Sequence, residues 1–597
     1  MLAFESSSFI SMPNPPSPAP KQASEDVSSS RVPFDMSTDS ARVAVIGAGP
    51  AGLAAIKSLQ EEGFQVTGFE RRPDVGGLWA FSDVPNYTSA TKDTRYQMSK
   101  FISCFTDFPF PDDFPRFPMA EDMASYYQSY AQHFGLMDRI RFGAVVRSVR
   151  RSSDDTAWLL DVEGEAEPLS FDKVLVAAGT ETVPKPLPEF EGRELFEGKV
   201  IHSQAYKRPK DFQGLNVVVV GQGNTACDCA VELASHARGV YLAHRRRAVV
   251  IPRNVDGQRY DRSLTWRMAR ISVWLQAHMP AVHRRLMCLQ LSGVARKAWG
   301  GSRAGEDALL GVTPALATNI ASLVVNDDLV PLLRGGGITA TRALKRFVGP
   351  RELEMEDGRV VRDVDAVIVC TGYTSSLGVL APGVLEYDDD DEDGDESTPC
   401  SDEEDYAIGA KQAHPAPRVP RLYRNIFPPR WADSLACLNY LVLIHAAVQR
   451  EVAGMAVAQV WAGKAALPPR AEMEAQADAQ ARGYRAARRR RRPQIAQPEG
   501  LVVDPHSWLR WVDEAAGSGV YASLGWTWRG LLFFVREPRL WLLAAWGVNS
   551  PHIYRFFETG KRRAWDGARE AILHVNEQSA ADARLGAAGA HATAAPS

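Results

Sequence analysis

The stretch "ARVAVIGAGPAGLAAIKSLQEEGFQVTGFERR", residues 41–72, decides the fold. Val43–Ile46 is a short run of apolar, β-branched residues typical of a buried parallel strand, and Leu53–Gln60 continues with helical periodicity. Between them the spacing G-x-G-x-x-G places small residues at Gly47, Gly49 and Gly52. The first glycine permits a tight turn, the second lets the backbone approach a pyrophosphate, and the third lets the helix pack on the strand. The stretch therefore predicts a dinucleotide-binding α/β unit.

An acidic residue closes the next predicted strand, "QVTGFE", at Glu70. A carboxylate there can accept hydrogen bonds from both hydroxyls of a ribose, and the preceding helix N-terminus offers N–H groups and a positive dipole end to phosphates. We expect Glu70 and the adjacent Arg71 to bind a first cofactor, together with the loop residues Gly47, Ala48, Gly49, Pro50, Ala51 and Gly52.

The pattern recurs in "GLNVVVVGQGNTACDCAVELASHARGVYLAHRRR", residues 214–247. Val217–Val220 is the predicted strand, and the three small-residue positions are Gly221, Gly223 and Ala226. No acid ends the following strand; the residues there are Arg245, Arg246 and Arg247. Guanidinium groups bind a 2′-phosphate in bidentate fashion, whereas a carboxylate would repel it. The first site ends in an acid and the second in arginines. This difference predicts that the first holds FAD permanently and that the second binds NADPH, the hydride donor.

Further motifs follow in a fixed order along the chain. They are "RRPDVGGLWAF" (71–81), "YQMSKFISCFTDFPFPDDFPRFP" (96–118), "FEGKVIHSQAY" (196–206), "GQGNTACD" (221–228), "VIVCTGY" (367–373) and "RLYRNIFPPRWADSLACLNYL" (421–441). This set resembles the flavin-containing monooxygenases over roughly residues 41 to 470, and the last hundred residues look most like fungal members.

The resemblance implies an activity and a set of site residues. The implied enzyme is similar to N,N-dimethylaniline monooxygenase: NADPH reduces FAD, O2 forms a C4a-hydroperoxyflavin, and one oxygen atom passes to a soft nitrogen or sulfur nucleophile. For FAD it implies Gly77, Leu78, Trp79, Gln97, Val146, Thr371 and Gly372, and for NADPH it implies Asn224, Thr225 and Asp228 beside the loop glycines and arginines. Gln97, His202 and Tyr206 are the implied catalytic residues.

The "FEGKVIHSQAY" motif lies where the chain leaves the first unit and enters the second. We expect His202 to order that junction rather than to transfer a proton. Baeyer–Villiger enzymes resemble this family but carry Trp, usually before Pro, where this chain has Tyr206 and Lys207, which favours the branch that oxidises heteroatoms. Gln97 stands where many family members have Asn, so an amide is kept. A Baeyer–Villiger activity and an uncoupled oxidase that releases H2O2 are the alternatives.

The expected architecture is α/β, with two nested Rossmann-like domains and a helical C-terminal extension. The predicted parts are a disordered tail (1–40), an FAD domain (41–206 and 341–470), an inserted NADPH domain (207–340), a basic linker (471–499) and helical residues 500–597. Asp388–Asp405 carries twelve acids and no base, and we expect a disordered insertion there. Ser263–Leu291 has helical periodicity with Trp and Met at its apolar positions.

Composition excludes several other classes. A net charge of -4 and 45% hydrophobic residues are typical of a globular protein, and a lone Arg488–Arg492 run does not predict a nucleic-acid site. Seven cysteines suggest a reducing compartment, and we expect a cytoplasmic enzyme without metal. Its partners should be O2 and a small amine or sulfide.

"LLFFV" and "LWLLAAWGV" near residues 531–548 are too short to span a bilayer and predict core helices, with peripheral membrane contact as the alternative. The sequence leaves the oligomeric state open.

Overall fold

The computed structural model describes residues 41–245, 248–300, 322–374, 377–387, 419–438, 446–490 and 504–593. The predicted N-terminal tail, the acidic insertion 388–405, and Arg246, Arg247, Arg491 and Arg492 lie outside the described residues.

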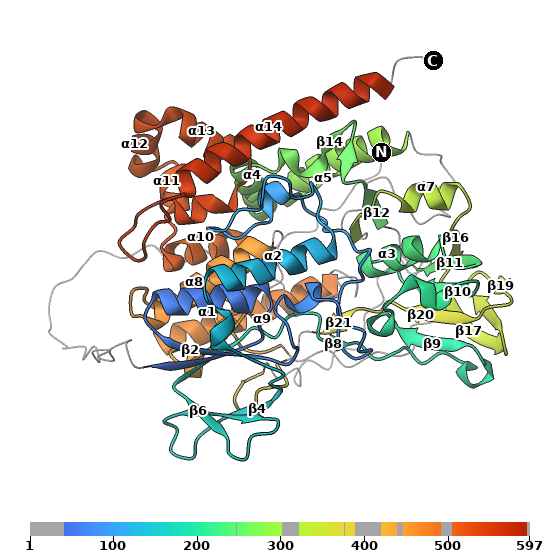
Figure 1. The fold of residues 1–597 in the computed structure, drawn as a ribbon, viewed down its shortest axis with the longest axis horizontal. Coiled ribbons are helices and arrows are strands. Elements are labelled where there is room, and N and C mark those ends of the chain that lie inside the picture. Colours follow the sequence, from blue (N-terminus) through green and yellow to red (C-terminus); the bar gives the residue numbers. More distant parts are fainter. Residues whose placement is uncertain are drawn as a thin grey trace, which may run out of the picture. The chain divides into compact units, whose positions relative to one another are not determined.

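A first five-stranded sheet contains the N-terminal glycine motif (Figure 1). Its strands are all parallel, in the order β22 (Leu435–Cys437), β7 (Lys173–Val176), β1 (Arg42–Ile46), β2 (Gln65–Glu70) and β3 (Ile140–Phe142). Side chains alternate across β1, so Val43 and Val45 join the core beside α1 (Pro50–Glu61) and α8 (Ala446–Trp461). Ala44 and Ile46 face the antiparallel strands β4 (Val146–Arg151), β5 (Trp158–Val162) and β6 (Leu169–Phe171). Both faces of the sheet are thus covered, as an all-parallel sheet requires.

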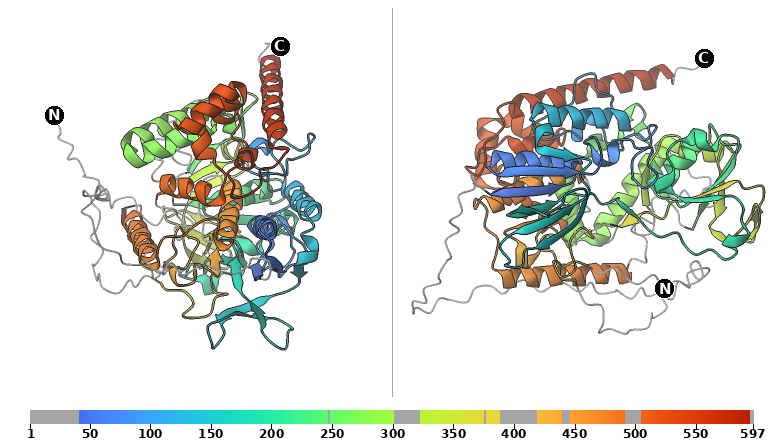
Figure 2. Two further views of the ribbon diagram at one scale, coloured as in Figure 1. Left: turned by 90° about the vertical axis from the view of Figure 1, so that its left-hand side faces the viewer. Right: turned by 60° about the horizontal axis from the view of Figure 1, so that its bottom comes forward.

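The second sheet repeats this plan (Figure 2). Its parallel order is β16 (Thr339–Arg342), β11 (Gly239–His244), β10 (Asn216–Val220), β20 (Ala366–Val369) and β9 (Lys199–His202). Val217 and Val219 pack toward α3 (Asn224–Leu233) and α7 (Leu329–Arg334). Val218 packs toward the antiparallel strands β17 (Leu344–Gly349), β18 (Glu352–Met355) and β19 (Val360–Val361). The α/β class with two Rossmann-type units is confirmed.

The second sheet extends beyond the residues 207–340 that the sequence predicted for the inserted domain. Strands β9 and β20 lie outside that range on either side, yet they pair with each other and β20 pairs with β10. Backbone hydrogen bonds between segments more than 160 residues apart define this edge of the sheet, and no local pattern marks them. By strand pairing, the inserted unit runs from β9 to β20.

The chain crosses between the two sheets twice, and the two crossings pair with each other. On the way out β8 (Val183–Pro184) runs antiparallel to β21 (Tyr373–Thr374) on the way back. The inserted unit also holds the parallel pair β12 (Ala248–Ile251) and β15 (Ser322–Val325) and the hairpin β13 (Asn254–Val255) with β14 (Gln258–Arg259).

Helices form the remainder of the described chain. In the inserted unit, α4 (Trp266–His278) and α5 (Pro280–Trp299) fall in the region of predicted helical periodicity. The remaining helices are α2 (Ala120–His133), α9 (Arg470–Arg490), α10 (Pro505–Ala516), α11 (Val520–Leu524), α12 (Trp528–Arg536), α13 (Pro538–Trp546) and α14 (Ala568–Thr593). Helix α9 corrects the prediction of a linker at 471–499, because Met473, Ala477, Ala481 and Tyr484 recur at helical spacing and are buried. The helical C-terminal region is confirmed.

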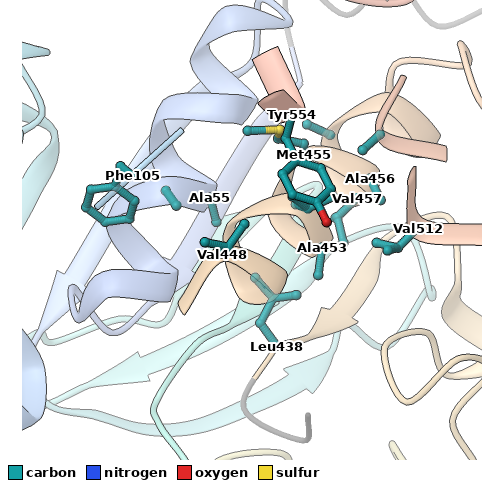
Figure 3. Packing of buried hydrophobic residues seen from close by; sticks show 14 of the residues in the cluster. Ala55, Phe105, Leu438, Val448, Ala453, Met455, Ala456, Val457, Val512 and Tyr554 are labelled. Carbon is teal, nitrogen blue, oxygen red and sulfur yellow. The ribbon is translucent and has the colours of Figure 1, made fainter. Parts of the chain in front are cut away.

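The C-terminal helices share one hydrophobic core with the first sheet (Figure 3). Ala55 of α1, Met455 of α8, Val512 of α10 and Tyr554, which follows α13, belong to this one core, and all four are almost fully buried. The last hundred residues therefore stabilise the first domain directly. In the described ranges every helix is too short or too polar to cross a bilayer, and His, Cys, Asp and Glu form no cluster there that could hold a metal.

Candidate functional site

The first glycine loop lies at the carboxyl end of β1. Gly47 has a φ of +100°, and Gly49 is the N-cap of α1, with Pro50 as the first helical residue. Pro50 has no N–H to leave unsatisfied, so it suits this position. A Cβ on Gly52 would lie 1.9 Å from the carbonyl oxygen of Gly47, which shows how closely the helix packs on the turn. The loop leaves helical N–H groups facing outward, as a phosphate site requires.

Glu70 lies buried beside this loop, at the end of β2. Its carboxylate accepts hydrogen bonds from the backbone N–H of Ala48, at 2.8 Å, and of Arg72, at 3.0 Å. These two bonds fix the side chain at the carboxyl edge of the sheet, where a ribose would lie next to the loop.

Residues 76–79, in the RRPDVGGLWAF motif, fold back against the first loop. A Cβ on Gly77 would lie 3.0 Å from the Cα of Gly49, so the two turns are in close contact. The buried Arg72 guanidinium donates to the carbonyl oxygens of Gly77, at 2.7 Å, and Ala80, at 2.9 Å. Trp79 then packs on Tyr96, with 4.8 Å between ring centroids, and so brings the 96–118 segment to the same site.

Other predicted FAD residues lie at the same edge. Val146 begins β4, two residues after Ala144, whose N–H donates to the carbonyl oxygen of Glu70 at 2.9 Å. Thr371 and Gly372 follow β20 at the crossing, and Gly372 has a φ of +84°. Thr371 Oγ1 is buried and has no hydrogen-bond partner among the described residues, so a bound group could satisfy it.

The second loop has the same form at the end of β10. Gly221 has a φ of +134°, and Gly223 caps α3. Ala226 occupies the third position and is fully buried, so its methyl group fits the helix–strand contact. Gly223, Asn224 and Thr225 are exposed, and a Cβ on Gly223 would meet no atom within 4 Å. The first turn of α3 is therefore open to a ligand.

Two predicted NADPH residues have protein partners. Asp228 accepts a hydrogen bond from Asn326 at 3.0 Å, and burial raises the pKa of Asp228 to about 6. Arg245, half exposed at the end of β11, donates to Glu356 at 3.0 Å. Asp228 thus orients the loop after β15, whereas the guanidinium of Arg245 is half exposed and pairs with Glu356.

His202 joins the crossing to the second sheet. Its Nδ1 accepts from the N–H of Gln204 at 3.0 Å, so its Nε2 donates to the carbonyl oxygen of Gly372 at 3.2 Å. Burial lowers the pKa of this imidazole, which keeps it neutral at neutral pH. Both ring nitrogens are therefore engaged in backbone hydrogen bonds, an arrangement that suits ordering of the junction.

Tyr206 connects the inserted unit to the first domain. Its ring is buried, and its hydroxyl donates to Glu232 of α3 at 3.0 Å. The other oxygen of Glu232 accepts from the hydroxyl of Thr91 at 2.6 Å. Nearby, Gln204 donates to Thr88 Oγ1 at 2.8 Å. These bonds hold the FEGKVIHSQAY motif against residues 88–91 of the first domain.

Two further residues of the inserted unit hold the segment that carries Gln97. Arg253 donates to the carbonyl oxygens of Tyr96, at 3.1 Å, and Arg95, at 2.9 Å. Asp261 accepts from the N–H of Ser99 at 2.7 Å. Gln97 is thus fixed between Trp79-bound Tyr96 and Ser99. Sequence reasoning missed Glu232, Arg253 and Asp261, because isolated charged residues outside a motif carry no signal of their tertiary partners.

Comparison with known proteins identifies the family. The sequence matches the family described as flavin-binding monooxygenase-like over residues 40–391. Monooxygenase aurF of Gibberella zeae is 34% identical over 550 residues, which cover 91% of this chain and 98% of that protein. The chain belongs to the flavin-binding monooxygenase-like family. Flavin-containing monooxygenase 5 of Oryctolagus cuniculus is 31% identical, with coverage of 90% and 92%.

Solved structures share the fold of this flavin-binding monooxygenase-like chain. The S-allyl-L-cysteine S-oxygenase of Allium sativum superposes with a TM-score of 0.55 at 19% identity, covering 91% of this chain and 99% of its own. Cyclohexanone monooxygenase in an open crystal structure also gives 0.55, at 14% identity, covering 81% and 98%. Because an S-oxygenase and a cyclohexanone monooxygenase match equally well, the fold alone does not choose between the branches.

FAD and NADPH are the cofactors of this flavin-binding monooxygenase-like protein, as they are in its family. The residues fit both groups: the first loop with Glu70 and the unpartnered Thr371 hydroxyl suits FAD, and the open turn at Gly223 with Arg245 suits NADPH. The assignment of individual residues to each cofactor stays a prediction.

Glu232 should make the stability of this flavin-binding monooxygenase-like chain pH-dependent. Burial raises the pKa of Glu232 from 4.5 to about 7, so the folded chain keeps a proton that the unfolded chain has released. The stability that this retained proton contributes to the folded chain is therefore fully present below pH 4.5 and is lost as pH rises through 7. We expect Glu232→Gln to flatten the decline of Tm between pH 5 and 7, measured by thermal unfolding of the holoprotein. An unchanged slope would contradict the raised pKa; Glu194→Gln, at an exposed glutamate, is the control.

Proposed function

We propose that this chain is an NADPH-dependent flavin monooxygenase that transfers one oxygen atom from O2 to a nitrogen or sulfur atom of a small organic substrate. FAD held by the first glycine loop would supply the oxygen-activating chemistry, and NADPH held by the second would supply the reducing equivalents. The residues of the chain have three tasks: to bind both cofactors, to bring them together, and to exclude water from the reacting atoms.

We base the proposal on the short paired connection between the two glycine loops. Gly47 packs on Ala177, directly before the outgoing crossing, and Gly221 packs on Cys370, directly before the returning crossing. The crossings pair at β8 and β21. Both loops thus lie at the carboxyl ends of parallel strands and are joined by one short double connection. Ligands of open α/β sheets bind at these strand ends, so two cofactors would face each other across the crossings.

The residues around the crossings are suited to positioning rather than to proton transfer. His202 is neutral and uses both ring nitrogens on backbone groups. Gln97 is the amide that would hydrogen-bond to the reacting end of the bound cofactors, since Arg253 and Asp261 fix its segment. Catalysis here would depend on how these residues position the two cofactors relative to each other.

Aromatic side chains of the segment after Gln97 pack on each other and on α2. The rings of Phe105 and Tyr130 are tilted toward each other with 4.0 Å between centroids, and Phe110 stacks on Phe114 with 4.4 Å. Tyr126 lies between them, 4.2 Å from Phe110. A packed apolar layer of this kind excludes water, which would otherwise divert the reaction to H2O2.

The choice of nitrogen or sulfur over a ketone rests on Tyr206. Its hydroxyl and Glu232 form a polar link, which a Trp side chain at this position could not make in the same way because its indole is wider and donates from another atom. The test is to give holoprotein NADPH with a panel of thioethers, tertiary amines and cyclic ketones, and to measure each product and H2O2 separately. Sulfoxide or N-oxide is expected. Ester from ketone without sulfoxide would overturn the choice of branch, and H2O2 alone would favour the oxidase.

Arg245 should select NADPH over NADH. An ionic hydrogen bond contributes about 1.5–3 kcal/mol, so Arg245→Ala should raise the KM for NADPH by about 10- to 100-fold and leave that for NADH unchanged. Steady-state kinetics with both nucleotides measures this. Arg238→Ala is the matched control, because Arg238 precedes β11 at the opposite end of the same strand and pairs with Asp365. Equal effects on NADPH and NADH would contradict the assignment.

A further inference from the structure

Helix α14 has one buried face that runs along its length. Ile572, Val575, Ser579 and Ala583 are buried and recur at helical spacing, whereas the residues between them are half-buried or exposed. Ile572 belongs to the core of the first domain. The carbonyl oxygen of Ala583 accepts a hydrogen bond at 2.7 Å from Gln258, in the hairpin β13–β14 of the inserted unit. One helix therefore contacts both domains (Figure 1).

The far end of this helix packs directly on the backbone of the inserted unit. A Cβ on Gly586 would lie 2.1 Å from the carbonyl oxygen of Gly257, and a Cβ on Gly257 would lie 2.2 Å from that of Gly586. Asp582 forms an ion pair at 2.5 Å with Arg116 of the first domain, and Arg116 donates in turn to Asn254 at 2.9 Å. The hairpin is thus held between α14 and the first domain.

Three buried polar side chains connect α14 to the segment that carries Gln97. Ser579 Oγ accepts a hydrogen bond from the guanidinium of Arg259 at 2.6 Å, and the same guanidinium donates to Asp261 at 2.6 Å. The other carboxylate oxygen of Asp261 accepts from the N–H of Ser99 at 2.7 Å. We call this connected set, Ser579, Arg259, Asp261 and the N–H of Ser99, the α14 bridge.

Burial makes each link in the α14 bridge depend on the next. Ser579, Arg259 and Asp261 are 7%, 3% and 1% exposed, so water cannot replace a lost partner. The guanidinium of Arg259 also lies 4.6 Å from the ring centroid of Phe101, which shares an apolar cluster with Val575 of α14. A buried charge that loses a partner is costly. Loss of the Ser579 hydroxyl should therefore shift the guanidinium, and with it the carboxylate that holds the Gln97 segment.

We propose that Arg259 and Ser579 are positioning residues, through which α14 sets the place of Gln97 beside the two cofactors. The inference rests on the proposed function, because Gln97 is the amide that would face the reacting ends of the cofactors. Ser99 lies two residues from Gln97, so a displaced N–H at Ser99 would displace the amide as well. A misplacement of about 1 Å can cost about 100-fold in rate, and here the loss would appear as H2O2 formed in place of product.

The first test measures hydrogen–deuterium exchange of the FAD-loaded full chain by mass spectrometry. In Ser579→Ala we expect the amide of Ser99 to exchange at least about tenfold faster than in the parent, because its acceptor Asp261 is no longer held. Ser579→Thr keeps a hydroxyl and should restore slow exchange. Gln578→Ala is the matched control, since Gln578 precedes Ser579 in α14 and donates to Asp112, outside the α14 bridge. Unchanged exchange in Ser579→Ala would overturn the proposal.

The second test compares product with NADPH consumed, using the thioether or tertiary amine that the substrate panel selects. Ser579→Ala should lower the product formed per NADPH by about three- to tenfold and raise H2O2 by the same amount, while FAD content and the KM for NADPH stay unchanged. Arg259→Lys should act in the same way, because an ammonium group cannot bridge Asp261 and Ser579 as the planar guanidinium does. Gln578→Ala should keep the parent ratio.

A purely structural role of the α14 bridge gives a different result. It would lower FAD content and Tm in Ser579→Ala and leave the ratio of product to NADPH unchanged in the folded fraction, which would overturn the proposal. If the parent chain formed no product, the proposed function would fail. The exchange measurement would then still decide whether α14 holds the Gln97 segment, with faster exchange in Ser579→Ala supporting it and unchanged exchange overturning it.

Discussion

Gly52→Ala is expected to abolish the folded, flavin-loaded protein. The new Cβ would lie 1.9 Å from the carbonyl oxygen of Gly47 and 2.9 Å from its carbonyl carbon. Both contacts are with backbone, so no side chain can rotate away, and α1 would have to move off β1. Overpacking typically costs about 1–3 kcal/mol and occasionally more, and here it would also displace the loop that is expected to bind FAD. The measurement is the yield of soluble yellow protein and its FAD content.

The variant Gly49→Ala tests FAD binding separately from folding. A Cβ on Gly49 would meet Gly77 Cα at 3.6 Å, which is an ordinary contact, and the backbone of Gly49 is extended. This variant should fold with a Tm close to that of the parent apoprotein but bind FAD weakly, since the methyl group would face the pyrophosphate. A normal yield of flavoprotein from Gly52→Ala would contradict the close packing of α1 on the turn.

Arg555→Met should have the second largest effect, through a buried charge cluster that joins the C-terminal helices to the first domain. Arg555 Nε lies 3.1 Å from Asp107 Oδ2, and Lys57 of α1 donates to the same carboxylate at 2.6 Å. Arg555 also donates to Glu61 at 2.9 and 3.0 Å. Burial favours the neutral acid, yet Arg555 and Lys57 hold the pKa of Asp107 below its ordinary value.

Removing one partner leaves buried charge without compensation, which costs about 3–5 kcal/mol. We expect a loss of that size in the free energy of unfolding, measured by urea titration of the holoprotein. Arg563→Met is the control in the same segment. Arg563 pairs with Asp566, and both side chains are more than 80% exposed, so a surface pair of this kind contributes at most about 1 kcal/mol. Equal losses in the two variants would show that the cluster does not stabilise the fold.

Local sequence determines the parts of the site that depend on backbone shape. Gly47 and Gly221 adopt positive φ, and each glycine loop joins a strand to a helix, as their spacing predicts. Glu70 lies where a ribose partner should lie, because it ends the strand next to β1. These features follow from sterics and periodicity within about thirty residues.

The sequence could not predict which residues far apart in the chain contact each other. Strands β9 and β20 are four residues each and pair across 160 residues, so the limits of the inserted unit were set too narrowly. The local sequence "VQREVAG" gives no sign of a partner for Glu451, yet this residue is buried and accepts two hydrogen bonds from Thr106. The same ambiguity affects α12, whose apolar residues predict a core although they face outward.

We propose above all that this chain transfers one atom of O2 to a nitrogen or sulfur nucleophile. The most direct measurement supplies the holoprotein with NADPH, 18O2 and a thioether or tertiary amine that the substrate panel selects, and follows NADPH, product and H2O2. We expect one 18O atom in each sulfoxide or N-oxide molecule and about one NADPH consumed per product. NADPH consumption matched by H2O2, or product oxygen that comes from water, would contradict it.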